Sequence, residues 1–392
     1  MRVITTTEEL KDFVSKLLKE KFVTIDTEFV REFTYYPQLC LIQIAPGSGG
    51  DGVAIDPMAE DLNLAPLKKL LTDKKVVKVF HSGEQDIEMF HNELSTMPKP
   101  VFDTQIAAQV LGYGEAISYA SLAKDICNKQ LDKSSRFTDW SRRPLSEKQI
   151  EYAISDVTYL RDIYVELQKR LIEKDRQKWI EEDLAELVNP KKYENNPKEA
   201  WLKFRSKHSS PTFLGILREV AKWREETAQD ENVPRGRVLR DDAVSEIAAA
   251  EPLTMDEIKR LRRIHQRSAS RYGEEIISAV KRGRRNPIKL LLSRKKFDPY
   301  IDSEALLSLL KVLLKRQCER QHVAQKLVAT VDELKEFSEL SDREIEKTKL
   351  PLLHGWRREV FGKYAIKLMH GKLALTVEDN QVCMLEYSDD KK

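Results

Sequence analysis

Two carboxylates end a short run of strand-forming residues near the start of the chain. Phe22 to Ile25 is aromatic and β-branched, which is typical of a buried strand, and Asp26 and Glu28 follow at once. Side chains two positions apart on a strand share a face, so these carboxylates would repel each other unless a cation lay between them. The pair predicts a metal site. The alternatives are that one carboxylate faces solvent or that Asp26 only caps a turn.

A third candidate acid, Asp86, follows another predicted strand, Val76 to Phe80. Ser82 and Gln85 have the spacing of a capping box, so we expect a helix to begin at Ser82 with Asp86 in its first turn. The alternative is that Asp86 only favours the positive end of the helix dipole.

A tyrosine and a fourth acid stand one helical turn apart later in the chain. Tyr152 and Asp156 fall inside a helix predicted over residues 147–173, and their i, i+4 spacing makes them neighbours on one face. Carboxylates that converge without His or Cys favour Mg²⁺ or Mn²⁺. Two such ions about 4 Å apart activate a water and stabilise the leaving oxygen of a phosphodiester. The tyrosine hydroxyl could position that water or help to deprotonate it.

The elements that must bring these residues together alternate between helix and strand. The opening strands predict an antiparallel meander, since a Gly-rich turn at 47–51 reads as a hairpin and lacks the spacing of a phosphate loop. Asp103 is expected to cap a helix. In chain order we expect a helix over 7–19, strands at 22–25, 39–45 and 52–56, a helix over 62–71, a strand at 76–80, a helix from 82, a strand or helix entry at 101–104 continuing as a helix to 111, and helices over 119–127 and 147–173.

Composition excludes several classes of protein. The chain has 392 residues, a third of them charged, and no apolar run near the ~20 residues that span a bilayer, so no membrane partner is expected. No secretory signal is expected. No Walker sequence is found, which disfavours an ATP-driven helicase. The four cysteines form no C-x-x-C pair, and a cytoplasmic location is expected. With a net charge of only +3, any nucleic-acid preference must come from local patches.

The acidic pattern resembles the DEDD superfamily of 3′→5′ exonucleases. The D-x-E motif is met by Asp26-Thr27-Glu28, the second acid by Asp86, and Y-x-x-x-D by Tyr152 and Asp156. The sister branch has a His five residues before the last Asp, where this chain has Glu151, so the tyrosine branch is implied. Within the superfamily the chain is similar to the bacterial ribonuclease D family. The resemblance implies an α/β RNase H-like exonuclease domain, a mixed sheet flanked by helices, over residues 1–172.

The resemblance also implies roles for the motif residues. Asp26, Glu28 and Asp156 would ligate the first of two Mg²⁺ or Mn²⁺ ions, Asp26 would bridge to the second, and Asp86 would hold that second ion directly or through water. Tyr152 would orient the attacking water.

Three further residues would lie near the terminal nucleotides by the same resemblance: Gln43, His81 and Arg143. A hydrogen-bonded core histidine for His81, and a surface charge for Arg143, remain as alternatives.

The second half of the chain is predicted to be helical. Pro190 and Pro197 break up a charged connector over residues 173–210. Residues 211–290 resemble an HRDC domain, and residues 295–378 resemble a second, divergent copy. The fold implied is therefore the exonuclease domain followed by two all-α HRDC bundles.

Between the two copies lies the densest basic stretch, which holds no acid from residue 281 to 296. We expect it to contact RNA phosphates without reading sequence; the alternative is a solvated helix end and linker. Its basic residues are Lys281, Arg282, Arg284, Arg285, Lys289, Arg294, Lys295 and Lys296.

The expected function is a metal-dependent 3′→5′ exoribonuclease that releases 5′-mononucleotides. The family's substrate class is structured RNA, notably the 3′ ends of tRNA precursors, and a monomer is expected. One alternative is a 3′→5′ DNA exonuclease, because the motifs do not distinguish ribose from deoxyribose. The other is a non-catalytic RNA-binding or scaffold protein, although such a protein would gain nothing from clustered carboxylates.

Overall fold

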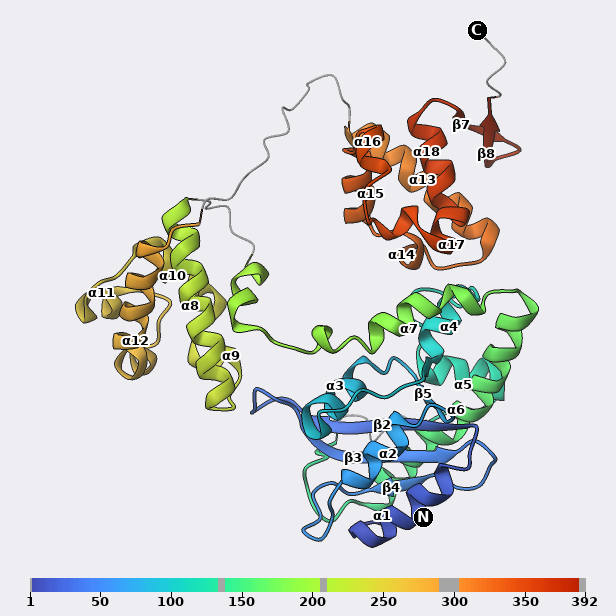
Figure 1. The fold of residues 1–392 in the computed structure, drawn as a ribbon, viewed down its shortest axis with the longest axis horizontal. Helices are drawn as coiled ribbons and strands as arrows, with labels where there is room; N and C mark the ends of the chain where they lie inside the picture. Colours follow the sequence, from blue (N-terminus) through green and yellow to red (C-terminus); the bar gives the residue numbers. More distant parts are fainter. Residues whose placement is uncertain (1, 133–137, 205–209, 289–302, 388–392) are drawn as a thin grey trace.

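The computed structural model describes residues 2–132, 138–204, 210–288 and 303–387 (Figure 1). Its N-terminal domain is built on a six-stranded mixed sheet with the strand order β1-β4-β3-β2-β5-β6. The predicted antiparallel meander is confirmed as β2-β3-β4, while β5 and β6 extend the sheet in parallel from β2. The two-residue strand β1 was not predicted. The strands are β1 (Val3–Ile4), β2 (Phe22–Val30), β3 (Gln38–Pro46), β4 (Val53–Ile55), β5 (Val77–Phe80) and β6 (Val101–Asp103).

Helices cover both faces of this sheet. On one face α1 (Thr7–Leu17), α2 (Ala65–Thr72) and α3 (Glu84–Leu94) pack on alternate apolar residues of the central strands, such as Ile25 and Ile42. On the other face lies α6 (Glu147–Glu173), with α4 (Thr104–Val110) and α5 (Tyr119–Cys127) beside it. Strand β2 is therefore enclosed by two layers of helices.

The start of α3 differs from the prediction. Ser82 does not cap the helix: its φ is +57°, in the left-handed region, and α3 begins at Glu84 with Gly83 as its N-cap. The carboxylate of Asp103 instead accepts the backbone N–H groups of Ser82 (3.2 Å) and Gly83 (2.7 Å). Asp103 also caps α4, as predicted, and so ties the two helix starts together. Asp86 lies in the first turn of α3, as expected.

The first helical bundle has a core of its own. A connector of short helical pieces, including α7 (Glu181–Leu187), leads to it from α6. The backbone N–H of Ile288 donates to the carbonyl of Pro211 at 2.9 Å, so the two ends of the bundle meet. Its helices are α8 (Pro211–Asp230), α9 (Arg235–Val238), α10 (Asp241–Ala250), α11 (Met255–Arg260) and α12 (Gln266–Arg285).

The first bundle opens with a long helix, a helix of one turn and a helix of intermediate length, and the second bundle opens with the same succession. Its members are α13 (Ser303–Gln321), α14 (Gln325–Val328), α15 (Val331–Ser338), α16 (Asp342–Ile345), α17 (Gly355–Arg357) and α18 (Lys363–Met369).

The prediction of purely helical structure to residue 378 is wrong at its end, because β7 (Leu373–Glu378) and β8 (Gln381–Glu386) form an antiparallel hairpin. Its turn residues Asp379 and Asn380 both have positive φ, as a two-residue hairpin turn requires.

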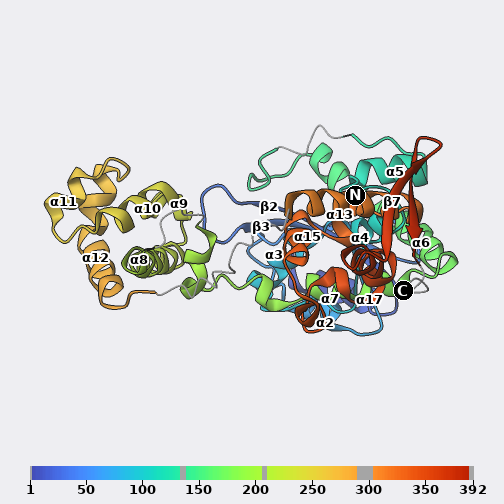
Figure 2. The same ribbon diagram turned by 90° about the horizontal axis from the view of Figure 1, so that it is seen from above.

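The two bundles contact the N-terminal domain in different ways. The second bundle shares one continuous apolar core with α4, α5 and α6, and the indoles of Trp179 and Trp356 stack 4.5 Å apart at their junction. The first bundle meets the sheet domain through the loop between β2 and β3 (Figure 2). Among the helices of the described residues, none is long and apolar enough to cross a membrane.

Candidate active site

Strand β2 carries the first two candidate ligands on the face that α6 covers. In the register with β3, Asp26 stands opposite Gln43, and a bulge interrupts the ladder between Glu28 and Phe29. The hydroxyl of Thr24 donates to the backbone carbonyl of Val157 at 2.7 Å. Because Val157 follows Asp156 directly, this bond fixes α6 against β2 at the level where their acids meet.

Three of the four predicted acids come together. One carboxylate oxygen each from Asp26, Glu28 and Asp156 lie within 4.8 Å of one another, and all three side chains are half-buried. Burial, and next the charge of Asp156, raise the pKa of Asp26 to about 8. Such a cluster is unfavourable as three free anions and fits a hard divalent cation.

The fourth acid, Asp86, is buried beside this cluster and lies outside the group of three. Thr27, the residue between the two β2 carboxylates, donates from its hydroxyl to Asp86 Oδ1 at 2.6 Å. Burial and the charge of Asp26 raise the pKa of Asp86 well above its usual value. Its contact with a second ion stays a prediction.

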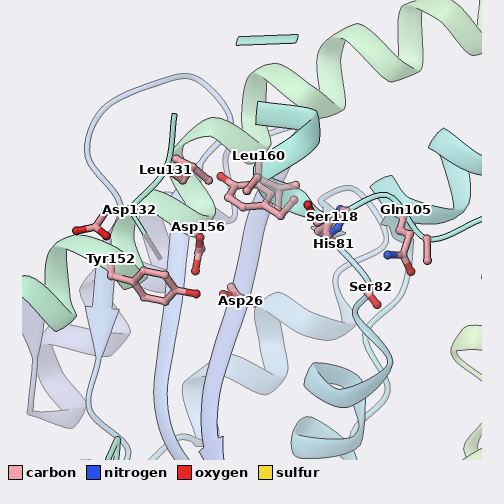
Figure 3. Close-up of a pocket in the computed structure, with 13 residues that line it drawn as sticks. Asp26, His81, Ser82, Gln105, Ser118, Leu131, Asp132, Tyr152, Asp156 and Leu160 are labelled. Atoms are coloured by element: carbon pink, nitrogen blue, oxygen red, sulfur yellow. The ribbon is translucent and has the colours of Figure 1, made fainter. Parts of the chain in front are cut away.

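Tyr152 projects from α6 toward Asp26 and Asp156 (Figure 3). Burial raises the pKa of its phenol, and the charges of Asp156, Glu28 and Asp26 raise it further. The hydroxyl therefore keeps its proton at neutral pH, which suits it to orient a water rather than to take a proton from it.

A cavity of about 360 Å³ opens beside these residues, between β2, α5 and α6. His81 lies on its wall at 2.9 Å from the hydroxyl of Thr104, and burial lowers the pKa of this histidine although Asp103 opposes the shift. The ring of Tyr119 lies 5.8 Å from that of His81, and its hydroxyl donates to the carbonyl of Ser155 at 2.7 Å. The cavity is therefore lined by the carboxylates of Asp26 and Asp156 and by the rings of His81 and Tyr119.

Several lining residues were missed by sequence reasoning: Ser82, Gln105, Ser118 and Tyr119. Tyr119 begins a correctly predicted helix, but its spacing carries no signal. Only the packing of α5 on α6 brings it to the cavity.

Gln43 and Arg143 lie deeper than expected for residues that touch a nucleotide. Gln43 is fully buried, and neither its amide nitrogen nor its amide oxygen has a hydrogen-bond partner in the protein. Arg143 forms a two-pronged ion pair with Asp56, with both N–O distances 2.7 Å, and also donates to the carbonyl of Cys40. Their contacts with nucleotides stay predictions.

The predicted basic patch is only partly described by the structure. On α12, Arg282 pairs with Glu219 and Arg284 with Glu251, each at 3.4 Å, so these two charges are partly compensated. Lys281 and Arg285 are exposed. The remaining four basic residues of the stretch, Lys289, Arg294, Lys295 and Lys296, lie outside the described residues.

Comparisons with known proteins find relatives over almost the whole chain. Residues 1–172 match the family model described as 3′-5′ exonuclease, and residues 213–280 match the HRDC domain. The chain is 42% identical over 389 residues to ribonuclease D of Nitrobacter hamburgensis, covering 99% of this chain and all of that protein. It is 40% identical to ribonuclease D of Bartonella henselae, covering 97% of this chain and 93% of that one.

Among solved structures, the chain is similar to Escherichia coli RNase D, an exoribonuclease involved in structured RNA processing. The TM-score is 0.80 at 27% identity, covering 94% of this chain and 98% of that one. The catalytic core of RRP6 from Trypanosoma brucei shares the fold at a TM-score of 0.53 and 22% identity, over 72% of this chain and 79% of that one. The chain belongs to the ribonuclease D family of 3′→5′ exoribonucleases.

Proposed function

We propose that this exoribonuclease removes 5′-mononucleotides by hydrolysis at a centre of two Mg²⁺ or Mn²⁺ ions. The observation that carries the proposal is the approach of Asp26, Glu28 and Asp156 to within 4.8 Å. The donors are all carboxylate oxygens, which fit hard divalent cations, and a cation held there would offset the burial and the like charge that raise the pKa of Asp26.

The proposed roles are those that the resemblance to the family implies, and the closeness of three of the acids supports them. Asp26, Glu28 and Asp156 would hold one ion, and Asp26 and Asp86 the other. Bound there, the ions would supply Lewis acidity that lowers the pKa of water and neutralises the leaving oxygen. Tyr152, still protonated at neutral pH, would direct the attacking water toward the phosphorus.

The cavity beside the acids would receive the terminal nucleoside. His81 is proposed to face it in its neutral form, since burial lowers the pKa of that imidazole. Gln43 and Arg143 are also proposed to lie near the terminal nucleotides. Gln43 stands opposite Asp26, and Arg143 holds the 140–144 segment against β3 and Asp56.

The proposed substrates are tRNA precursors and other structured RNA 3′ ends, in the cytoplasm, with the enzyme as a monomer. The four cysteines, all within the described residues, form no disulfide, which supports a reducing compartment. The domains are proposed as exonuclease over 1–172, connector over 173–210, and HRDC copies over 211–290 and 295–378. The repeated succession of helices supports the second copy.

A digest of a 3′-labelled tRNA precursor tests the proposal. Labelled 5′-mononucleotide should appear with Mg²⁺, not with EDTA, and not with the Asp156→Asn variant. A DNA strand of the same sequence, run in parallel, addresses the deoxyribonuclease alternative. Equal release in EDTA would contradict the two-metal centre.

A further inference from the structure

The loop between β2 and β3, residues 31–37, presents two aromatic rings to solvent. Phe33 is 62% exposed and Tyr36 is 42% exposed. Large aromatic side chains are usually buried on folding, because moving a ring from water into the protein interior is favourable. In Figures 1 and 2 the loop reaches from the sheet to the side of the first bundle. The rings therefore lie on an outward surface at the junction of two domains.

Hydrogen bonds from the first bundle hold this loop in place. The hydroxyl of Tyr35 accepts from Arg235 Nη2 at 2.9 Å and from Gln229 Nε2 at 3.1 Å, and it donates to Glu225. The backbone N–H groups of Tyr35 and of the next residue both donate to Asn232 Oδ1 at 3.1 Å. Tyr35 is therefore anchored to the first bundle, while Phe33 and Tyr36 on either side of it stay exposed.

An exposed cation stands beside one of the rings. The guanidinium of Arg237, from α9, lies 6.0 Å from the centre of the Phe33 ring, within the range of a cation–π contact. No carboxylate pairs with Arg237 among the described residues, in contrast to Arg235, which is bound to Glu225. A flat apolar surface and an available guanidinium are the two groups that a nucleotide needs, one for its base and one for its phosphate.

The loop also lies within reach of an RNA strand held at the acidic cluster. Phe33 follows Glu28 by five residues, and five residues of extended chain span at most about 18 Å. We propose that Phe33 and Tyr36, with Arg237, form a stacking site for unpaired bases upstream of the scissile phosphodiester. This rests on the proposed function, in which the RNA 3′ end occupies the cavity. The site is indifferent to sequence, because every base has a face that stacks.

Binding of a 12-nucleotide single-stranded RNA tests the site. In the Asp156→Asn background with Mg²⁺, which prevents cleavage, the double variant Phe33→Ala/Tyr36→Ala should raise Kd at least about tenfold, the loss expected for bases that no longer stack. Phe33→Trp/Tyr36→Trp should return Kd to within about twofold of the parent. Tyr387→Ala removes an aromatic ring that is 58% exposed elsewhere and should leave Kd unchanged. Equal thermal midpoints would show that all these chains fold.

Two further measurements separate stacking from a structural effect. An abasic nucleotide stepped along the RNA should weaken binding at one or two upstream positions with the parent chain and at none with the double Ala variant. A dinucleotide is too short to reach the loop, so the parent and the Phe33→Ala/Tyr36→Ala variant, both with Asp156 intact, should hydrolyse it at equal rates.

An unchanged Kd for the 12-nucleotide RNA overturns the proposal. A change confined to self-association on a sizing column would also overturn it, and would assign the rings to a protein contact instead. Failure of the unmodified chain to release nucleotides from any RNA would refute the proposed function, which is a separate result.

Discussion

Thr27 reaches Asp86 from the position between the two metal-binding candidates of β2. Its hydroxyl donates a 2.6 Å hydrogen bond to a buried carboxylate that comes from α3, 59 residues later in the chain. The middle residue of the D-x-E motif thus links the first acidic pair to the acid that stands apart from it.

Removing this hydroxyl should weaken the hold on the second ion. Thr27→Val keeps the shape of the side chain and leaves Asp86 without its donor. Loss of a partner that orients a ligand typically costs 10–100-fold in metal affinity or activity, so the Mg²⁺ concentration for half-maximal activity should rise by about that factor. Thr27→Ser, which retains a hydroxyl, is the matched control and should stay near the parent value. A titration identical to that of the parent would mean that Asp86 needs no such orientation.

Loss of a central ligand should stop hydrolysis and spare binding. Asp26→Ala or Asp156→Asn should lower turnover by roughly 10³-fold or more, because the cluster acts as a unit. Kd for RNA should change little, since the loops and bundles that would hold the strand are untouched. Asp125→Asn, an exposed acid on α5, is the control. Wild-type rates in Mg²⁺ for either variant would refute the metal assignment.

Tyr152→Phe should slow the chemical step with metal binding intact. The phenol lies among three carboxylates and keeps its proton, so its absence leaves the water less well directed. A fall in kcat of about 10²-fold is expected, with the Mg²⁺ requirement unchanged. Single-turnover rates at saturating Mg²⁺ measure this directly, and kinetics equal to the parent's would remove Tyr152 from the mechanism.

The metal-free protein should lose stability as pH rises. The pKa of Asp26 is about 8 in the folded chain against 3.8 for the ordinary carboxyl. A raised folded-state pKa means that its stabilising contribution is complete below about pH 4 and is lost as pH rises toward and through 8. The Asp26→Asn variant lacks this titration. In EDTA its Tm minus the Tm of the parent should therefore increase by several degrees from pH 5 to pH 9. Added Mg²⁺ should raise the Tm of the parent at pH 8 and have little effect on the variant. A constant Tm difference across this range would contradict the shift.

Arg357 should be needed for the second bundle to stay in place. Its buried guanidinium donates to both oxygens of Asp183, at 2.7 and 2.8 Å, and to Glu182 at 3.0 Å. Arg357→Ala leaves the half-buried carboxylate of Asp183 without its cation, which should cost roughly 2 kcal/mol in the free energy of unfolding by urea. Arg358→Ala, in which an exposed arginine is lost, should cost less than about 0.5 kcal/mol. Equal losses for the two variants would argue against the interface.

The candidate acids could be predicted from the sequence because each pair obeys a local period. Asp26 and Glu28 follow the alternation of a strand, and Tyr152 and Asp156 follow the turn of a helix that the structure gives with the predicted bounds. Arg143 shows the limit of such reasoning: its partner Asp56 stands 87 residues away, and no local pattern announces that ion pair.

Two local errors have physical causes that are visible in the structure. Ser82 has the sequence of a cap, yet the distant carboxylate of Asp103 satisfies the N–H groups there and leaves Ser82 in a left-handed conformation. The C-terminal hairpin was overlooked although Asp379 and Asn380 favour its turn, because the preceding helical pattern was extended through an alternating segment. At Ser82 a tertiary hydrogen bond overrode the local capping signal. At the hairpin a helical period was applied to residues that alternate as in a strand.

The meeting of Ile288 with Pro211 has a practical meaning for anyone who wishes to dissect the enzyme. The two ends of the bundle meet, and its apolar core also includes Ala200, Trp201 and Phe204 of the connector, so a segment over residues 197–288 should fold when expressed alone. The second bundle has no separate core, since Leu310 and Phe361 belong to the same apolar core as Leu160 of α6. Shortening the chain from its C-terminus would strip the catalytic lobe of part of its own interior, so the contribution of the first bundle should be measured by internal excision.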